Sequence, residues 1–353
     1  MGPLRILMGR GTDRAQKAWK SRDGSVLRPL AVFMGQGPAP DGRRKFLRVE
    51  DAGGTGKIKR RPWGRAVVYG KGGIFMLSEQ RKNEEKELEK RELFWLPGMT
   101  SVTFRGKKPE EVIALAKEAR LLGIEWGGDI HVPPEDLEEA RRVGRMTREE
   151  GLLVLSYGSY YHLGRGEPVE PVLEAARELG APNVRIWAGD FTPDAAPEAY
   201  WEKAVSELQE ICRKAEALGL TVSTEYHRGT LTQTREGALR LMRGAGCRNL
   251  FTYWQPNPDI SHEKNLLELE GVRSHLSSIH VFQWKRKDVR YPLEEGLQEW
   301  ESYLRKGPGV PWGACILEFV KDDSPEQFLK DARCLHGILR RLGLHTEKTR
   351  KTE

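Results

Sequence analysis

The sequence predicts an α/β protein, namely a (β/α)8 or TIM barrel that is preceded by a poorly structured basic segment. Three observations predict this fold. Strand-like and helix-like segments alternate from Pro97 onward, there are eight segments of each kind, and the residues before Pro97 keep no regular hydrophobic period. We therefore divide the chain into a basic extension, a barrel and a polar tail, which are residues 1–96, 97–343 and 344–353.

The eight predicted strands are short apolar or alternating runs. They span residues 100–106, 123–129, 151–161, 183–189, 220–227, 249–255, 276–284 and 314–320. The helices between them carry start and stop signals, because several begin with Pro or an acidic first turn and end on Gly. Eight such units in about 250 residues are typical of this barrel. A doubly wound sheet would more usually show a Gly-rich phosphate loop after its first strand, and "TFRGKKPEE" is not one.

The positive charge of the chain belongs to its N-terminal segment. Residues 1–95 hold 22 Lys and Arg against 11 Asp and Glu, whereas the whole chain has a net charge of only +7. The segment is rich in Gly and basic residues, so we expect it to be disordered. Two interpretations of this segment remain open. It is a basic arm that binds nucleic acid or an acidic surface, or it is a non-functional extension and translation starts at Met99.

Composition limits the class of protein. With 38% apolar residues, the chain can bury a large core, but no run approaches the roughly 18 apolar residues of a membrane span. The N-terminus does not resemble a signal peptide. The four cysteines form no CxxC pair and occupy apolar or helical patterns, which favours reduced thiols. These features predict a cytoplasmic protein without a membrane partner.

Polar side chains mark the carboxyl ends of the predicted strands, where barrels of this kind carry their chemistry. In chain order they are Glu125, His162, Arg185 with Trp187, Glu225 with His227, Gln255, His280 and Glu318. Alternation along a strand places Glu225 and His227 on one face. We expect these groups to converge at the mouth of the barrel.

Five of the segments resemble the sugar phosphate isomerase/epimerase family, the xylose-isomerase-like barrels: "GIEWGGDIHVP", "VRIWAG", "STEYHRGT", "SSIHVF" and "CILEFV". The resemblance covers residues from about 98 to 342 and none of the extension. It implies a divalent metal (Mn, Mg, Co or Zn) whose ligands are Glu225, Gln255, His280 and Glu318. It also implies a small-molecule sugar or sugar phosphate substrate.

The resemblance implies chemistry by proton transfer through an enediolate, with Glu225 and Glu318 as the acid and base. The expected substrate-binding residues are Glu125, His162, Arg185, Trp187 and His227. Trp126, Trp254 and Trp284 are expected to pack in the core rather than to bind substrate.

One ligand departs from the family pattern. Gln255 stands where the family usually has a carboxylate, and an amide oxygen can ligate a hard cation but removes one negative charge. Asp259 is an alternative ligand for this position.

Three other functions remain open. They are a lyase or dehydratase acting on a keto-sugar or inositol derivative, a catalytically inactive sugar-binding barrel, and a DNA endonuclease with a multi-zinc cluster. Nucleic acid is not expected as a partner, because the basic segment lacks the interleaved aromatic residues of a known binding module and eight histidines, several on predicted helices, are too few for such a cluster. Whether the chain forms a homo-oligomer is open.

Overall fold

The computed structural model describes residues 94–285, 289–308 and 312–344, together with three pairs of short antiparallel strands before residue 94. These pairs join β1 (Trp19–Lys20) to β2 (Val26–Leu27), β3 (Glu50–Asp51) to β4 (Gly54–Thr55), and β5 (Ile58–Arg60) to β6 (Ala66–Val68). The chain separates into two compact units, Met1–Gln80 and Arg81–Glu353. The expectations of a disordered extension and a polar tail lie almost entirely outside the described residues.

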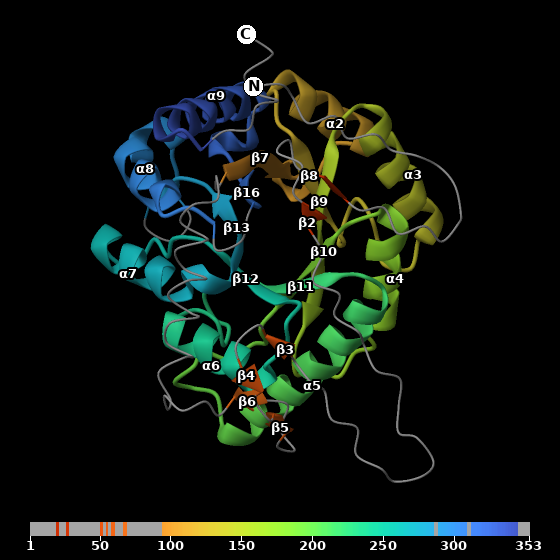
Figure 1. The fold of residues 1–353 in the computed structure, drawn as a ribbon. Helices are drawn as coiled ribbons and strands as arrows, with labels where there is room; N and C mark the ends of the chain where they lie inside the picture. Colours follow the sequence, from red (N-terminus) through yellow and green to blue (C-terminus); the bar gives the residue numbers. More distant parts are fainter. Residues whose placement is uncertain are drawn as a thin grey trace. The chain divides into compact units, whose positions relative to one another are not determined.

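The second unit contains the predicted barrel. Eight strands, each parallel to both of its neighbours, close into a ring that Figure 1 shows at the centre of this unit. They are β7 (Phe94–Thr100), β8 (Gly123–Gly127), β9 (Leu153–His162), β10 (Asn183–Trp187), β11 (Thr221–Thr224), β12 (Leu250–Trp254), β13 (Leu276–Val281) and β16 (Trp312–Leu317). The predicted fold class is confirmed.

Eight helices surround this ring in Figure 1. They are α2 (Pro109–Glu118), α3 (Leu137–Glu149), α4 (Glu170–Leu179), α5 (Glu198–Ala217), α6 (Arg235–Ala245), α7 (His262–Val272), α8 (Leu297–Arg305) and α9 (Pro325–Leu342). The sequence signals explain several of their ends. Ser261 and Ser324 cap the starts of α7 and α9, and Gly180 and Gly246 end α4 and α6 in the left-handed conformation.

Short elements complete the second unit. Turns of 3-10 helix span Ser101–Phe104, Arg273–His275, Leu293–Gly296 and Lys321–Asp323, and β14 (Trp284–Lys285) pairs with β15 (Val289–Arg290) after β13. In the part of the chain that the structure describes, each helix is too short or too polar to cross a lipid bilayer.

The first strand begins earlier than the sequence predicted. β7 spans Phe94–Thr100, whereas residues 101–104 of the predicted strand form a 3-10 turn. The predicted range was wrong, and local propensity disfavours Pro97 inside a strand because proline cannot donate a ladder hydrogen bond. Pairing of β7 with β8 begins only at Gly98, so no ladder bond to β8 is lost at Pro97.

The proposed boundaries near Pro97 and Met99 therefore fall inside β7. A chain that starts at Met99 would lack Phe94–Gly98, which includes the fully buried Trp95. The indole N–H of Trp95 donates to the carbonyl of Leu304, which ties the first strand to α8.

Large aromatic side chains fill the space around the strands. Trp95, Trp126, Trp201, Trp254 and Trp300 are all at most 2% exposed, and Trp126 and Trp254 are core residues as predicted. Inside the ring, a hydrogen-bonded polar layer joins Ser156, Asn183, Ser223 and Ser277. Because these groups satisfy one another, the polar interior carries little of the usual cost of burial.

Candidate metal and substrate site

A cavity of about 190 Å³ lies among the residues at the carboxyl ends of the strands. Its polar lining includes Arg185, Glu225, His227, Gln255 and Glu318, and its aromatic lining includes Tyr160, Trp187, Phe282, Trp284 and Phe319. A mostly apolar cavity with a few convergent polar groups is typical of a small-molecule site.

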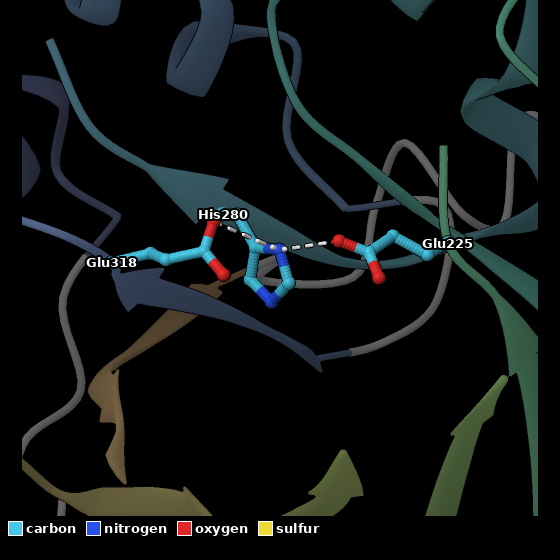
Figure 2. Close-up of side chains that lie close together, drawn as sticks. All are labelled: Glu225, His280 and Glu318. Atoms are coloured by element: carbon cyan, nitrogen blue, oxygen red, sulfur yellow. Dashed lines mark ion pairs between the residues drawn. The ribbon is translucent and has the colours of Figure 1, made fainter. Parts of the chain in front are cut away.

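Three predicted ligands meet at the base of this cavity, which Glu225 and Glu318 line and behind which His280 lies fully buried. Glu225 follows β11, His280 belongs to β13 and Glu318 follows β16, and one ligand atom from each lies within 4.8 Å of the other two. The Nδ1 atom of His280 is 3.6 Å from an oxygen of Glu225 and 3.6 Å from an oxygen of Glu318. Figure 2 shows the imidazole between the two carboxylates.

The backbone holds both glutamates in place. Each is the first residue after its strand, and each still donates its amide N–H to the neighbouring strand, from Glu225 to Ile186 and from Glu318 to Val281. The two side chains therefore project from the hydrogen-bonded ends of barrel strands rather than from loops.

Gln255 joins the same group. Its Oε1 atom lies 3.2 Å from His280 Nδ1, so three side-chain oxygens surround one ring nitrogen. One N–H can be directed at only one of these three acceptors. A divalent cation among the four donor atoms would satisfy all of them, and imidazole with carboxylate and amide oxygens suits Mn, Mg, Co or Zn. The residues present therefore fit the predicted metal.

Asp259 does not belong to this group. Its carboxylate lies 3.0 Å from the guanidinium of Arg228, at the exposed rim of the cavity. The alternative ligand suggested by the sequence is therefore engaged elsewhere, whereas Gln255 is in place.

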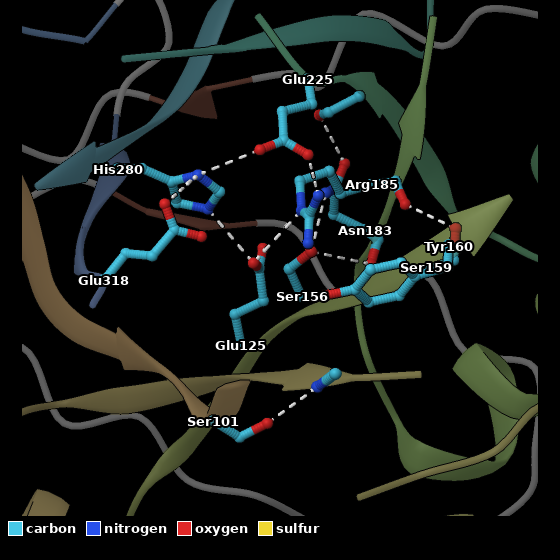
Figure 3. A network of polar contacts seen from close by, with 12 residues as sticks. Ser101, Glu125, Ser156, Ser159, Tyr160, Asn183, Arg185, Glu225, His280 and Glu318 are labelled. Atoms are coloured by element: carbon cyan, nitrogen blue, oxygen red, sulfur yellow. Dashed lines mark hydrogen bonds and ion pairs between the residues drawn. The ribbon is translucent and has the colours of Figure 1, made fainter. Parts of the chain in front are cut away.

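Arg185 and Glu125 form a charged layer beneath the three ligands, which Figure 3 shows together. The Arg185 guanidinium donates to Glu225 through Nη1 and lies 3.3 Å from Glu125 through Nε. The same Glu125 oxygen lies 3.2 Å from His280 Nε2. Glu125 and His280 are both 0% exposed.

This arrangement shifts the pKa values of Glu225 and Glu318 in opposite directions. Burial opposes ionisation of Glu225, but the charge of Arg185 and the contact with His280 lower its pKa to about 2. For Glu318, burial raises the pKa, and the charge of Glu225 adds to this rise against the opposing charges of His280 and Arg185. Two carboxyl groups with divergent pKa values are a common feature of acid/base sites.

The same carboxylates control His280. Although burial favours the neutral ring, Glu318, Glu125 and Glu225 raise the pKa of His280 to about 10. In the metal-free chain these carboxylates therefore favour the protonated form of the imidazole. A metal can bind at Nδ1 only when the proton on that atom is released.

Trp187 forms one wall of the cavity between two imidazoles. Its ring stacks on His162 with centroids 5.0 Å apart and an interplanar angle of 19°, and His227 lies 4.4 Å away at 52°. Burial lowers the pKa of both histidines. His162 is also held by Asp190, whose carboxylate lies 2.8 Å from its Nδ1 atom.

The five predicted substrate-binding residues differ in whether they line the cavity. Arg185, Trp187 and His227 line the cavity, whereas Glu125 and His162 are not among its lining residues. Glu125 is fully buried beneath the ligands, and His162 lies behind Trp187. Position at a strand end does not reveal whether a side chain reaches the cavity or supports a residue that does.

The opposite wall was missed by sequence reasoning. Trp284 was expected to be a packing residue, but it lines the cavity beside Phe319, with ring centroids 5.9 Å apart. Arg290 lies against both rings. Phe319 has a φ of 47°, a left-handed conformation that is rare for a bulky residue and that no sequence signal announces.

A family model described as "Xylose isomerase-like TIM barrel" matches residues 113–336. Among curated proteins, the sequence has no significant match.

Solved structures share the fold at low identity. The probable 3-DHS dehydratase AsbF from Bacillus anthracis is 16% identical with a TM-score of 0.58, and the match covers 69% of this chain and 98% of that one. The 3-keto-D-glucoside 4-epimerase YcjR from E. coli is 18% identical with a TM-score of 0.53, covering 70% and 99%. A xylose isomerase-like TIM barrel protein from Mycobacterium smegmatis in complex with magnesium is 17% identical with a TM-score of 0.52, covering 71% and 98%.

Proposed function

The chain belongs to the xylose isomerase-like TIM barrel family, and from this premise we propose that it is a metal-dependent isomerase or epimerase of a sugar or sugar phosphate. The observation that carries the proposal is the convergence of Glu225, His280 and Glu318 at the base of the cavity. Membership alone leaves the reaction open, because the structural neighbours include both an epimerase and a dehydratase.

The proposed metal ligands are the two glutamates, His280 Nδ1 and the amide oxygen of Gln255. A divalent cation bound there would polarise a substrate carbonyl and acidify the adjacent C–H bond. The residues around it supply the remaining parts of the reaction.

The two glutamates are suited to different tasks. Isomerisation beside a carbonyl removes a proton from carbon, leaves an enediolate and returns a proton to a neighbouring atom or to the opposite face. We assign the proton transfer to Glu318, whose carboxylate would take the proton from carbon and, once protonated, return it to the neighbouring atom of the enediolate. Glu225 is fixed by Arg185 in its ionised form, which suits a ligand and an electrostatic stabiliser.

The walls of the cavity are suited to a polyhydroxylated ring. Trp187 and Trp284 offer flat apolar faces, and His227 and Arg185 offer donors for hydroxyl, carbonyl or phosphate oxygens. A few fixed polar groups in an aromatic cavity provide orientation as well as affinity.

A lyase or dehydratase is the second candidate, since loss of a β-hydroxyl group from the same enolate would need the same base. The likeness to a dehydratase supports it. A catalytically inactive sugar-binding barrel is the third candidate, and the replacement of a carboxylate by Gln255 is the feature that supports it.

Solvent exchange tests the proposal. The Mn²⁺-loaded protein is incubated in D₂O with ketoses, their phosphates and keto-cyclitols, and deuterium at the carbon beside the carbonyl is followed by NMR. We expect incorporation with at least one substrate, and its loss in Glu318→Gln. Incorporation with an isomeric product indicates the isomerase, and an unsaturated product indicates the dehydratase. Tight binding of a sugar without exchange indicates the inactive barrel.

A further inference from the structure

Glu125 is a buried charge in contact with the ligand group that the proposed reaction does not use. It belongs to β8, is 0% exposed and does not line the cavity. One of its carboxylate oxygens contacts both Arg185 Nε, at 3.3 Å, and His280 Nε2, at 3.2 Å. A buried carboxylate in this place needs a reason, because burying a charge is costly.

The contact with His280 bears on the proposed metal. A histidine ligand usually donates its second ring N–H to a carboxylate or carbonyl, which fixes the ring and the atom that binds the metal. Here Nε2 faces Glu125, and Nδ1 faces the oxygens of Glu225, Gln255 and Glu318. Glu125 therefore directs Nδ1 toward the ligand group.

The charge balance points the same way. The ligand group alone has two carboxylates, from Glu225 and Glu318, and Arg185 offsets one of these charges. Glu125 brings the buried carboxylates to three, so that two negative charges remain when His280 is neutral. A divalent cation would balance them. Gln255 contributes no negative charge to the ligand group, whereas Glu125 supplies one from the charged layer below.

We propose that Glu125 is a positioning residue, which orients His280 as a ligand through Nδ1 and supplies the negative charge that Gln255 does not. This inference rests on the proposed metal-dependent function. It explains how the site can bind a divalent cation although an amide replaces one carboxylate.

Mn²⁺ affinity of the full chain tests the proposal, measured by calorimetry or by the EPR signal of free Mn²⁺. We expect Glu125→Gln to weaken binding about 10- to 100-fold. The second substitution Gln255→Asp, made in that variant, should recover at least half of the lost affinity on a logarithmic scale. The matched control is Glu207→Gln, which removes a half-buried carboxylate on α5 that bonds Tyr161 and Gly164 and should leave Mn²⁺ affinity within twofold.

The outcomes separate the two claims. No Mn²⁺ binding by the unaltered chain overturns the proposed metal site, and this inference with it. Unaltered binding in Glu125→Gln overturns only the role of Glu125. An affinity loss that Gln255→Asp does not reverse overturns the charge part of the proposal.

A second measurement covers the case in which Glu125→Gln does not fold. In the Zn²⁺-loaded chain labelled with ¹⁵N-histidine, the His280 resonances are assigned by their absence in His280→Gln. Protonated Nε2 with metal-bound Nδ1 supports the proposal, and metal bound through Nε2 contradicts it.

Discussion

The base of the cavity and its rim hold the same kinds of charged groups in opposite surroundings. At the base, Arg185 contacts Glu125 and Glu225, and all three are at most 3% exposed. Beside His162, which stacks on the Trp187 wall, at what we call the rim, Arg165 pairs with Asp190, and both side chains are more than 40% exposed. Water screens the rim pair, whereas the buried group depends on its own balance of charge. Ion pairs of the same residue types therefore have different tasks at the base and at the rim.

Removal of the central cation at the base should have the largest effect. Arg185→Leu leaves Glu125 and Glu225 buried without their main counter-charge, and we expect it to lower the free energy of unfolding by about 3–5 kcal/mol. Urea denaturation of the metal-free protein measures this. The rim control, Arg165→Leu, should cost at most about 1 kcal/mol. Equal losses in the two variants would remove the distinction between base and rim.

Another buried carboxyl is held by hydrogen bonds rather than by a guanidinium. Asp331, on α9, accepts hydrogen bonds from the Leu293 amide and from Gln327, and burial raises its pKa to about 6 against these bonds. Because the folded chain binds this proton more tightly than the unfolded chain, its stabilising effect is complete below about pH 4 and is lost as the pH rises through 6.

Asp331→Asn should therefore increase stability at pH 7 by about 3 kcal/mol, since the pKa rises by about two units from 3.8 and one unit corresponds to about 1.4 kcal/mol. The gain should vanish near pH 4. Urea denaturation of both chains from pH 4 to 7 gives the difference curve. A difference that is constant with pH would mean that Asp331 ionises normally in the folded protein.

Backbone strain beside Glu318 should have a smaller effect. Phe319 has a φ of 47°, where a side chain costs about 1–2 kcal/mol relative to glycine. Phe319→Gly and Phe319→Ala lose the same ring, but only the glycine variant relieves the strain. We expect the glycine variant to be more stable by about 1 kcal/mol in thermal or urea unfolding. An alanine variant of equal or greater stability would show that the position is unstrained.

The smallest effect is expected at the rim. Asp259→Asn breaks the contact with Arg228 and should cost less than about 1 kcal/mol. It should leave Mn²⁺ affinity within twofold, because Asp259 is not a ligand in this account. A tenfold loss of Mn²⁺ affinity would restore Asp259 as a ligand.

Much of this site follows from the sequence, because alternation and strand ends are local patterns. The count of βα units predicted the barrel, and the ends of three strands predicted Glu225, His280 and Glu318. Position along a strand does not give depth in the barrel, so Glu125 was assigned to the substrate. The sequence did not predict that Phe319 and Trp284 line the cavity. Their positions depend on the left-handed backbone of Phe319 and on packing against Arg290.

The pairing of β7 shows the same limit. Pro97 is a strand breaker by local propensity, but the ladder around it leaves its missing N–H without consequence. Only the three-dimensional register reveals that.

The proposed function depends on a divalent cation bound at the base of the cavity. The most direct test is elemental analysis of the protein purified without chelator, alongside Glu318→Gln. We expect about one Mn, Mg, Co or Zn per chain, and its loss in the variant. A chain without metal that takes up none when Mn²⁺ is supplied would contradict this expectation and favour the inactive sugar-binding barrel.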